Sequence, residues 1–476
     1  MKLLILRFFV FAISCVAIPL YSGDGEAPFF IEGYSGQVSY APGEELTLHI
    51  STSAASFSVE VTRVGAERMT VWKQEGLAGR ARDIPEDASS NGCGWPESVT
   101  VPIPAEWKSG YYHVALRIRD NGGKYVRRNA RTAEASCYFV LREAPGIAEP
   151  SPVLLQLSTS TYNAYNNWGG FSLYAFHGRG GNQGHRVSFL RPPSSLFSNW
   201  EQGFVEWAER EGIRLAYAAN SDLEFRPEVM EKRRLVLSVG HDEYWSAPMR
   251  DHLEGFIGGG GNVAFFSGNT CCWQVRSEDG GSALTCWKQN YQTDPIYGVR
   301  GSYATLSSLW SHHLVERPEN KLTGVGFLWG GYHLSHGQYM DGSGAFTVHR
   351  PDHWLFEGTG LKRGDSVGGK HTVVGYECDG CEMEWRDGLP FPTSRDGTPE
   401  NFAILGTAPA RWHPDDCQWY DKWENGREGH AVLGVYQRGG TVITTGSTDW
   451  VHGLRGGDEA VERITRNVIR KLSEAK

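Results

Sequence analysis

The sequence predicts an α/β fold, with a mostly parallel sheet and helices on both faces, preceded by a β-sandwich. Two observations lead to this division. Between residues 29 and 143, short runs alternate apolar and polar residues, which is typical of antiparallel strands with one buried face. After about residue 150, unbroken apolar runs of strand length alternate with helical segments, which is typical of a parallel sheet covered by helices.

The N-terminal part contains the alternating runs expected of a sandwich. They lie at residues 45–50, 56–61, 111–118 and 137–141, with turn signals at 41–43 and 120–123. Residues 144–152 are rich in proline and predict a linker. The expected domains are therefore a signal peptide at 1–22, an immunoglobulin-like β-sandwich at 23–147 and an α/β domain at 148–476.

In the second part, the apolar runs predict strands at residues 153–157, 215–218, 235–239, 263–266 and 442–445. The clearest helix begins at Ser246 as N-cap, has Pro248 in its first turn and stops at the glycines 258–261. A last helix is expected at 458–472. Residues 277–430 show little periodicity and are interpreted as elaborations around the sheet.

Charge and targeting signals restrict the possible partners. The 476 residues contain 46 Lys and Arg against 55 Asp and Glu, with no basic run, so a nucleic-acid partner is not expected. Lys2 and Arg7 precede an apolar stretch from Phe8, which predicts a cleavable export signal and a secreted or periplasmic protein. Acylation of Cys15 is a weaker alternative. No second stretch is apolar and long enough to span a membrane.

Removal of the signal would leave eight of the nine cysteines, and an even number in an exported protein predicts disulfides. Cys378 and Cys381 have the spacing of a local disulfide or half a zinc site, and the disulfide is favoured. Cys271 and Cys272 follow an apolar run, as a hydrolase nucleophile would, but the glycine of a nucleophile elbow is missing. Disulfides are favoured there too.

Polar residues gather directly after the predicted strands. These clusters occupy residues 158–167, 220–222, 240–244, 267–269 and 446–450, and the extended segment 372–377 ends on a carboxylate. Ligands bind beyond the carboxyl ends of parallel strands, so a pocket is expected there. His241 and Glu243 are two residues apart, which places both side chains on one face of an extended chain. An imidazole beside a carboxylate suits acid–base chemistry or metal binding.

Four of these motifs, in order, resemble the large subunit of N,N-dimethylformamidase. They are Thr-Tyr-Asn-Ala-Tyr-Asn at 161–166, Gly-His-Asp-Glu-Tyr-Trp-Ser at 240–246, Phe-Phe-Ser-Gly-Asn at 265–269 and Gly-Tyr-Glu-Cys-Asp-Gly at 375–380. The similarity extends over about residues 105–472. It implies a glutamine-amidotransferase-like domain, and an amide bond cleaved at a mononuclear iron held by two tyrosines and one glutamate.

Carried over by motif, the resemblance implies Glu243 and Tyr162 as iron ligands. The second tyrosine is expected at Tyr112, with Tyr111 as its alternative. Further polar residues of the implied site are His241, Asn269 and Glu377.

Phenolate and carboxylate oxygens favour a hard cation such as Fe(III), which would polarise a carbonyl and activate water. His241 or Glu377 could then move the proton to the departing amine, and Asn269 could stabilise the oxyanion. The leading prediction is therefore an exported, iron-dependent hydrolase of small amides.

Two other functions stay open at this point. One is a non-catalytic or carbohydrate-binding module, in which tryptophans such as Trp168, Trp273, Trp329 and Trp450 would stack on sugar rings. The other is a cysteine hydrolase of the amidotransferase type that uses Cys271 or Cys272. The substrate, the disulfide connectivity, homo-oligomerisation and the presence of a small subunit are not determined by the sequence.

Overall fold

The computed structural model describes residues 29–119, 132–334, 340, 343–412 and 428–474. The predicted signal peptide at 1–22, with Cys15, lies outside the described residues, as does Cys417. Within the described ranges, no helix combines the length and the apolar character that a membrane crossing requires.

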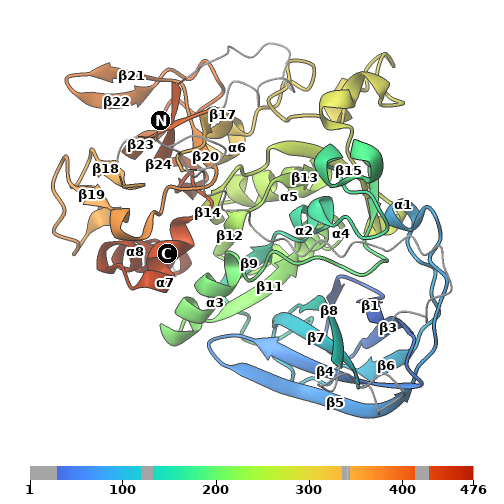
Figure 1. The fold of residues 1–476 in the computed structure, drawn as a ribbon. Coiled ribbons are helices and arrows are strands. Elements are labelled where there is room, and N and C mark those ends of the chain that lie inside the picture. Colours follow the sequence, from blue (N-terminus) through green and yellow to red (C-terminus); the bar gives the residue numbers. More distant parts are fainter. Residues whose placement is uncertain (1–28, 120–131, 335–339, 341–342, 413–427, 475–476) are drawn as a thin grey trace, which may run out of the picture.

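The N-terminal part consists of two facing sheets (Figure 1). The first has the order β1 (Ile31–Ser35), β3 (Glu45–Thr52), β6 (Val99–Pro102). The second has the order β2 (Ser39–Tyr40), β8 (Thr132–Leu141), β7 (Gly110–Arg119), β4 (Ser56–Val64), β5 (Arg68–Ala78). Apolar side chains from both sheets share one core. The alternating runs seen in the sequence all lie within these strands, while the domain boundaries at 22 and 147 stay predictions.

The second of these sheets packs directly against the rest of the chain. Tyr111 and Tyr138 belong to the same hydrophobic core as Phe197, and the rings of Tyr111 and Phe197 stack with centroids 3.9 Å apart. Two ion pairs cross the same junction, between Arg63 and Glu209 at 2.6 Å and between Arg142 and Asp222 at 3.2 Å. The two parts therefore share a continuous buried interface.

A nine-stranded sheet forms the centre of the second part (Figure 1). Its order is β11 (Leu215–Ala219), β9 (Val153–Leu157), β12 (Leu235–His241), β14 (Asn262–Gly268), β25 (Gly440–Thr444), β24 (Glu428–Arg438), β23 (Ala403–Arg411), β18 (Phe346–Val348), β19 (Ser366–Val367). The first five pair in parallel, and the last four continue the sheet with antiparallel pairs.

The predicted fold class is therefore wrong. The protein is mostly β, with 35% strand against 23% helix, and its sheets are mixed or antiparallel. The physical reason lies in the region interpreted as elaborations. Its end contributes β23 and the first residues of β24, and β24 reaches β25 through the single residue Gly439, whose φ is +75°. So short a connection can form only an antiparallel hairpin, because a parallel crossover needs a dozen residues or more.

Helices and irregular segments cover this sheet. On one side, α3 (Glu201–Arg210), α7 (Trp450–Gly456) and α8 (Glu459–Ser473) pack onto one core. On the other side, α4 (Asn220–Phe225), α5 (Ala247–Gly258) and α6 (Asn320–Thr323) join long irregular stretches around a second core. As the sequence predicts, α5 begins at Ser246, whose hydroxyl accepts the N–H of Met249 at 3.3 Å.

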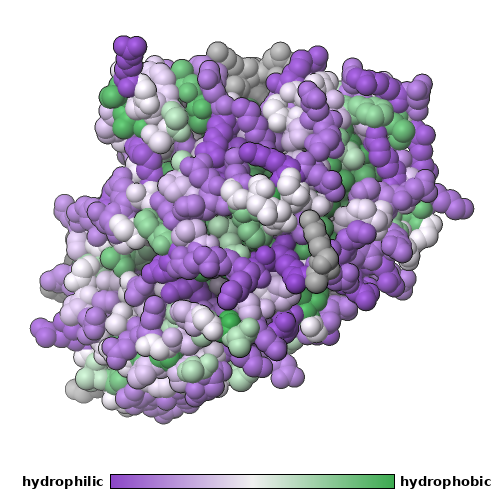
Figure 2. All heavy atoms as spheres, turned by 180° about the vertical axis from the view of Figure 1, so that it is seen from behind, coloured by the Kyte–Doolittle hydropathy of each residue, from purple (hydrophilic) through white to green (hydrophobic). Residues whose placement is uncertain are grey.

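Shorter elements complete the fold. They are α1 (Ala88–Asn91), α2 (Thr159–Tyr165), β10 (Arg186–Ser188), β13 (Tyr244–Ser246), β15 (Trp273–Glu278), β16 (Ala283–Thr285), β17 (Gly326–Gly331), β20 (Cys378–Gly380), β21 (Met383–Arg386) and β22 (Leu389–Pro392). The surface seen from behind is mostly hydrophilic, with apolar residues in small separate groups (Figure 2).

The predicted disulfides are absent from the described part of the chain, where seven cysteines are buried free thiols. Side-chain direction explains why the close pairs do not form a bond. Cys378 and Cys381 belong to different hydrophobic cores. The adjacent Cys271 and Cys272 also point into separate cores. Sequence proximity therefore does not bring these sulfur atoms together.

Candidate active site

The polar clusters that follow the parallel strands meet at one edge of the sheet. The carboxamide oxygen of Asn220, after β11, accepts the N–H of Ser160, after β9, at 2.8 Å. Thr161 in turn accepts the backbone N–H of Glu243, after β12, at 2.9 Å. At the other end of the row, the backbone N–H of Ser447 donates to the carbonyl of Ser267 at 3.1 Å. All five clusters thus form one continuous polar region.

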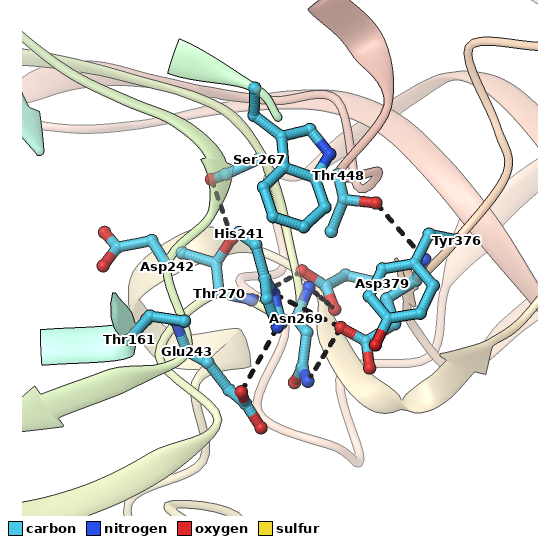
Figure 3. A network of polar contacts seen from close by, with 12 residues as sticks. Thr161, His241, Asp242, Glu243, Ser267, Asn269, Thr270, Tyr376, Asp379 and Thr448 are labelled. Atoms are coloured by element: carbon cyan, nitrogen blue, oxygen red, sulfur yellow. Dashed lines mark hydrogen bonds and ion pairs between the residues drawn. The ribbon is translucent and has the colours of Figure 1, made fainter. Parts of the chain in front are cut away.

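At the centre of this region, His241 lies between two carboxylates (Figure 3). Its Nε2 is 3.3 Å from Glu243 Oε2, and its Nδ1 is 3.2 Å from Glu377 Oε2. The carboxamide of Asn269 donates to the same Glu377 oxygen at 3.3 Å. The relative exposures of these residues lie between 1% and 4%, so the charges interact in a region shielded from water. The three predicted catalytic residues and Glu243 therefore come together.

The two carboxylates change the proton affinity of His241. Burial by itself lowers the pKa of this imidazole, but the charges of Glu377 and Glu243 outweigh burial and raise it to about 9. Burial raises the pKa of Glu377, and the neighbouring charge of Glu243 adds to the effect. The pKa of Glu243 is lowered, because the hydrogen bond and charge of His241 outweigh its burial. The two carboxylates therefore favour the protonated form of the imidazole that lies between them.

Two tyrosines and a tryptophan lie beside Glu243 and His241. The Tyr174 hydroxyl contacts both carboxylate oxygens, at 3.0 and 2.9 Å, and the indole N–H of Trp273 donates to Oε1 at 2.8 Å. Tyr165, the last residue of α2, packs with its ring centroid 4.4 Å from that of Tyr174, and its hydroxyl lies 3.2 Å from His241 Nε2. Burial and the charge of Glu243 raise the pKa of both phenols well above the usual range.

A buried lysine completes this charge arrangement. The Lys288 ammonium lies 3.4 Å from the ring centroid of Tyr174 and 4.6 Å from that of Trp273, and it donates to the Tyr244 hydroxyl at 2.9 Å. Burial lowers the pKa of Lys288, while the charge of Glu243 opposes this effect. A cation over an aromatic face is attracted by the ring. Lys288 therefore attracts the rings of Tyr174 and Trp273, and its charge is also attracted by Glu243.

Two further carboxyl groups, those of Asp242 and Asp379, hold the segments that carry the site. Asp242 accepts hydrogen bonds from the side chains of Gln156, Asn220 and Ser238, which come from three neighbouring strands or their ends. Asp379 accepts the backbone N–H groups of Asn269 at 2.9 Å and Thr270 at 3.1 Å (Figure 3). The fully buried carboxyl group of Asp379 therefore holds the turn that carries Asn269.

Several residues of the site adopt backbone conformations that L-amino acids rarely use. Asn269 has φ +49°, Cys271 +56° and Lys288 +53°. Gly240, next to His241, has φ +81°, and a Cβ added there would lie 2.3 Å from the Cβ of Trp200. Left-handed non-glycine residues cost free energy and cluster at functional sites. Their concentration here supports the assignment of this region as the active site.

The predicted tyrosine ligands lie elsewhere. The Tyr112 hydroxyl donates to the backbone carbonyl of Lys108 at 2.7 Å within the N-terminal core, and the alternative, Tyr111, contacts Ser195 at 2.9 Å. The Tyr162 hydroxyl donates to Glu201 at 2.5 Å. None of these contacts is with Glu243. The structure thus separates the predicted ligand set: the phenol that contacts Glu243 is that of Tyr174, and the phenol that contacts His241 is that of Tyr165.

These two phenols matter because carboxylates and imidazoles alone do not form a metal site here. Among the described residues, no group of three or more His, Cys, Asp or Glu side chains could hold a metal ion. Tyr165, Tyr174 and Glu243 instead offer oxygen donors from α2, from the loop after it and from the end of β12. Such hard oxygen donors suit a hard cation.

The two alternative functions receive little support from these positions. Cys271 and Cys272 are buried, and burial raises the pKa of both thiols, which disfavours a nucleophilic thiolate. Trp450 is fully buried, with its ring against that of Phe266, and Trp273 is bonded to Glu243. These tryptophans pack the core or orient the site and do not form a sugar platform.

The sequence prediction did not single out Tyr165, Tyr174 or Lys288. Tyr165 belongs to the same short motif as Tyr162, and spacing alone does not distinguish two aromatic residues three positions apart on a helix. Tyr174 and Lys288 lie in aperiodic segments, where no local pattern marks a function. The only signal available was the high density of aromatic residues between 162 and 176.

Comparisons with known proteins find similarity to one family. The profile described as "N,N-dimethylformamidase beta subunit-like, C-terminal" matches residues 58–463. A curated relative, the N,N-dimethylformamidase beta subunit of an Alcaligenes species, is 23% identical over 458 residues, which cover 80% of this chain and 54% of the relative. The chain thus spans about half the length of that relative. The resemblance inferred from four short motifs is confirmed, and all four lie within the matched region.

Proposed function

Because the chain belongs to the N,N-dimethylformamidase beta subunit-like family, we propose that it hydrolyses the C–N bond of a small amide. The observation that carries this proposal is the buried group of Glu377, His241 and Glu243, with the phenol of Tyr174 against Glu243 and that of Tyr165 against His241. It combines groups that exchange protons with a cluster of oxygen donors in one place.

We further propose that an iron ion belongs to this site and that Tyr165, Tyr174 and Glu243 would hold it. The donor set fits, because it supplies two phenols and one carboxylate from neighbouring side chains. A ferric ion bound there would supply Lewis acidity, which polarises an amide carbonyl. Trp273, through its bond to Glu243 Oε1, keeps the carboxylate turned toward Tyr174.

The protonation state of the phenols couples metal binding to pH. The pKa of both phenols is raised by burial and by Glu243, so both are neutral before a cation binds. Phenols must lose their protons to become ligands, and binding therefore releases protons. The Lys288 ammonium, 3.4 Å from the centre of the Tyr174 ring, favours the negative charge that develops on that phenol.

The remaining residues have roles in proton transfer and orientation. His241 lies within ion-pair distance of carboxylates on both sides and can pass a proton between a water molecule and the departing amine. Glu377 accepts a proton when the imidazole gives one up. The carboxamide oxygen of Asn269 is buried and has no hydrogen-bond partner among the described residues, so it can accept from a substrate N–H or a water molecule.

The test compares tyrosine variants that differ only in their position relative to Glu243. Wild-type protein loaded with Fe(III) is expected to show a tyrosinate-to-iron charge-transfer band in the visible and to hydrolyse small amides. Tyr174→Phe and Tyr165→Phe should each shift or abolish the band and lower kcat/KM by about a hundredfold or more. Tyr162→Phe is the matched control, because its hydroxyl contacts Glu201. It should keep the band.

Two results would contradict the proposal in different ways. Loss of the band in Tyr162→Phe, with Tyr174→Phe unchanged, would restore the ligand set implied by the sequence resemblance. Amide turnover that is insensitive to His241→Asn and Glu377→Gln would remove the proton-transfer roles, whichever tyrosines bind the metal.

A further inference from the structure

Arg191 is a fully buried cation with neutral partners. Its Nε donates to the Ser188 carbonyl at 2.9 Å. Its Nη1 donates to the carbonyls of Trp168 and Phe171, and its Nη2 to the carbonyl of Asn166 and, at 3.4 Å, to the side-chain oxygen of Asn163. A guanidinium has five N–H donors, so all of them are used.

No described carboxylate lies within ion-pair distance of this guanidinium, which distinguishes it from other buried arginines. Arg250, which is equally buried, is paired with Glu254 at 2.8 Å, and Arg142 is paired with Asp222. Burial without a counter-charge lowers the pKa of Arg191 to about 9. An uncompensated buried charge is costly, so the contacts it makes must offset a large desolvation penalty.

Three of the four carbonyls that Arg191 binds, those of Asn166, Trp168 and Phe171, lie between the two phenols in the sequence. Asn163 and Asn166 belong to the C-terminal end of α2, next to Tyr165, and the turn from Trp168 to Phe171 leads to Tyr174. This turn contains Gly169 and Gly170, with φ of +84° and +106°. Two adjacent glycines have wide conformational freedom, so the turn does not hold a single geometry by itself.

We propose that Arg191 is a positioning residue that clamps this turn and thereby sets the spacing of Tyr165 and Tyr174. The clamp joins four backbone carbonyls and one side chain into a single hydrogen-bonded unit. Its planar fork also binds the Asn166 carbonyl at the end of α2, where a positive charge is favourable. The role in metal binding rests on the proposed function, whereas the clamp itself can be measured in metal-free protein.

The geometry explains why a lysine cannot replace this arginine. A lysine ammonium has three donors around one point, whereas the guanidinium reaches acceptors on opposite sides of a plane. Arg191→Lys therefore keeps the charge and loses at least two of the five bonds. The released carbonyls belong to the turn between the phenols, so the phenol pair becomes looser while its own side chains stay intact.

The experiment measures two quantities in Arg191→Lys, with Arg250→Lys as the matched control. Arg250 also binds two backbone carbonyls, those of Arg317 and Pro318, but through a different part of the chain. In metal-free protein, hydrogen–deuterium exchange of the amides at 166–174 should rise about tenfold in Arg191→Lys only, as expected for the loss of one or two hydrogen bonds. Fe(III) affinity, followed by the visible band, should fall about tenfold in the same variant.

A second variant, Gly169→Ala, alters the same turn without changing Arg191. A Cβ at position 169 would lie 2.8 Å from the backbone nitrogen of Ser89. Gly169→Ala should therefore disturb the turn while Arg191 stays intact, and faster exchange at 166–174 with unchanged Fe(III) affinity in that variant would overturn the link between this turn and the phenol spacing.

The outcomes separate the clamp from the proposed function. Unchanged exchange at 166–174 in Arg191→Lys, or an equal effect in Arg250→Lys, would overturn the clamp. Faster exchange with unchanged Fe(III) affinity would overturn its positioning role. Wild-type protein that binds no Fe(III) would refute the proposed metal site, while the exchange comparison would still decide whether the clamp exists.

Discussion

Glu201 provides a quantitative test of how burial changes the pKa of a carboxyl group in this fold. Its carboxyl group is buried at the start of α3, where Oε1 accepts the Tyr162 hydroxyl at 2.5 Å and the Ser158 N–H at 3.3 Å. Its Oε2 has no hydrogen-bond partner among the described residues. A bare carboxylate oxygen in such a place would be costly, whereas a protonated carboxyl is tolerated.

The pKa of Glu201 determines the sign and size of the effect. Burial raises it from 4.5 to about 7, although the hydrogen bond from Tyr162 lowers it. Because the folded pKa exceeds the unfolded one, this stabilising contribution is complete below about pH 4.5 and is lost as the pH rises through about 7. A shift of this size corresponds to about 3 kcal/mol in total, of which about 2 to 3 kcal/mol is lost between about pH 5 and about pH 8.

Glu201→Gln cannot ionise, so it removes this pH dependence while preserving the shape of the side chain. The free energy of unfolding in denaturant, measured for both proteins across this pH range, should favour the variant progressively as the pH rises. Tyr162→Phe removes the hydrogen bond that lowers the pKa, so its stability loss should move to higher pH. A difference between wild type and Glu201→Gln that is constant from about pH 5 to about pH 8 would refute the reasoning.

Two further predictions concern the backbone and the thiols of the site. Gly240→Ala should destabilise the protein by about 2 kcal/mol or more in thermal unfolding, because it combines a positive φ with a clash against Trp200. Gly43→Ala, with φ +91° but open space around it, should cost about 1 kcal/mol, and equal costs would show that the clash is unimportant. Cys271 and Cys272 should resist a thiol reagent in native protein and react after unfolding, as mapped by mass spectrometry. Fast native labelling of either would revive the cysteine-hydrolase alternative.

Much of the local structure was predictable because it depends on near neighbours. The apolar runs at 153–157, 215–218, 235–239 and 263–266 all lie within strands, and α5 begins at the N-cap expected from Ser246. The mixed character of the sheet was not predictable from those runs. It results from β23, which lies in the region without clear periodicity, and from β24, which turns back on β25 in a tight hairpin and pairs with β23 on its other side.

The candidate site divides in the same way. His241, Glu243, Asn269 and Glu377 follow strands or extended segments, so their meeting at one edge could be expected from the rule for strand ends. That rule does not predict which tyrosine hydroxyl contacts the site. Tyr162 and Tyr165 occupy one short helix and belong to one motif, but the first points to Glu201 and the second to His241.

The sequence by itself determined the elements, the polar strand ends and the family, because each of these is encoded in contiguous residues. Only the tertiary structure decided which phenols face Glu243, that the nearby cysteines stay apart, and that Arg191 closes the turn between Tyr165 and Tyr174. Those outcomes depend on which element packs against which, and the packing joins residues that are distant in the chain. The helix or strand propensity of a residue is a local property. The partner of its side chain depends instead on which face of the helix or strand is buried, and against which element.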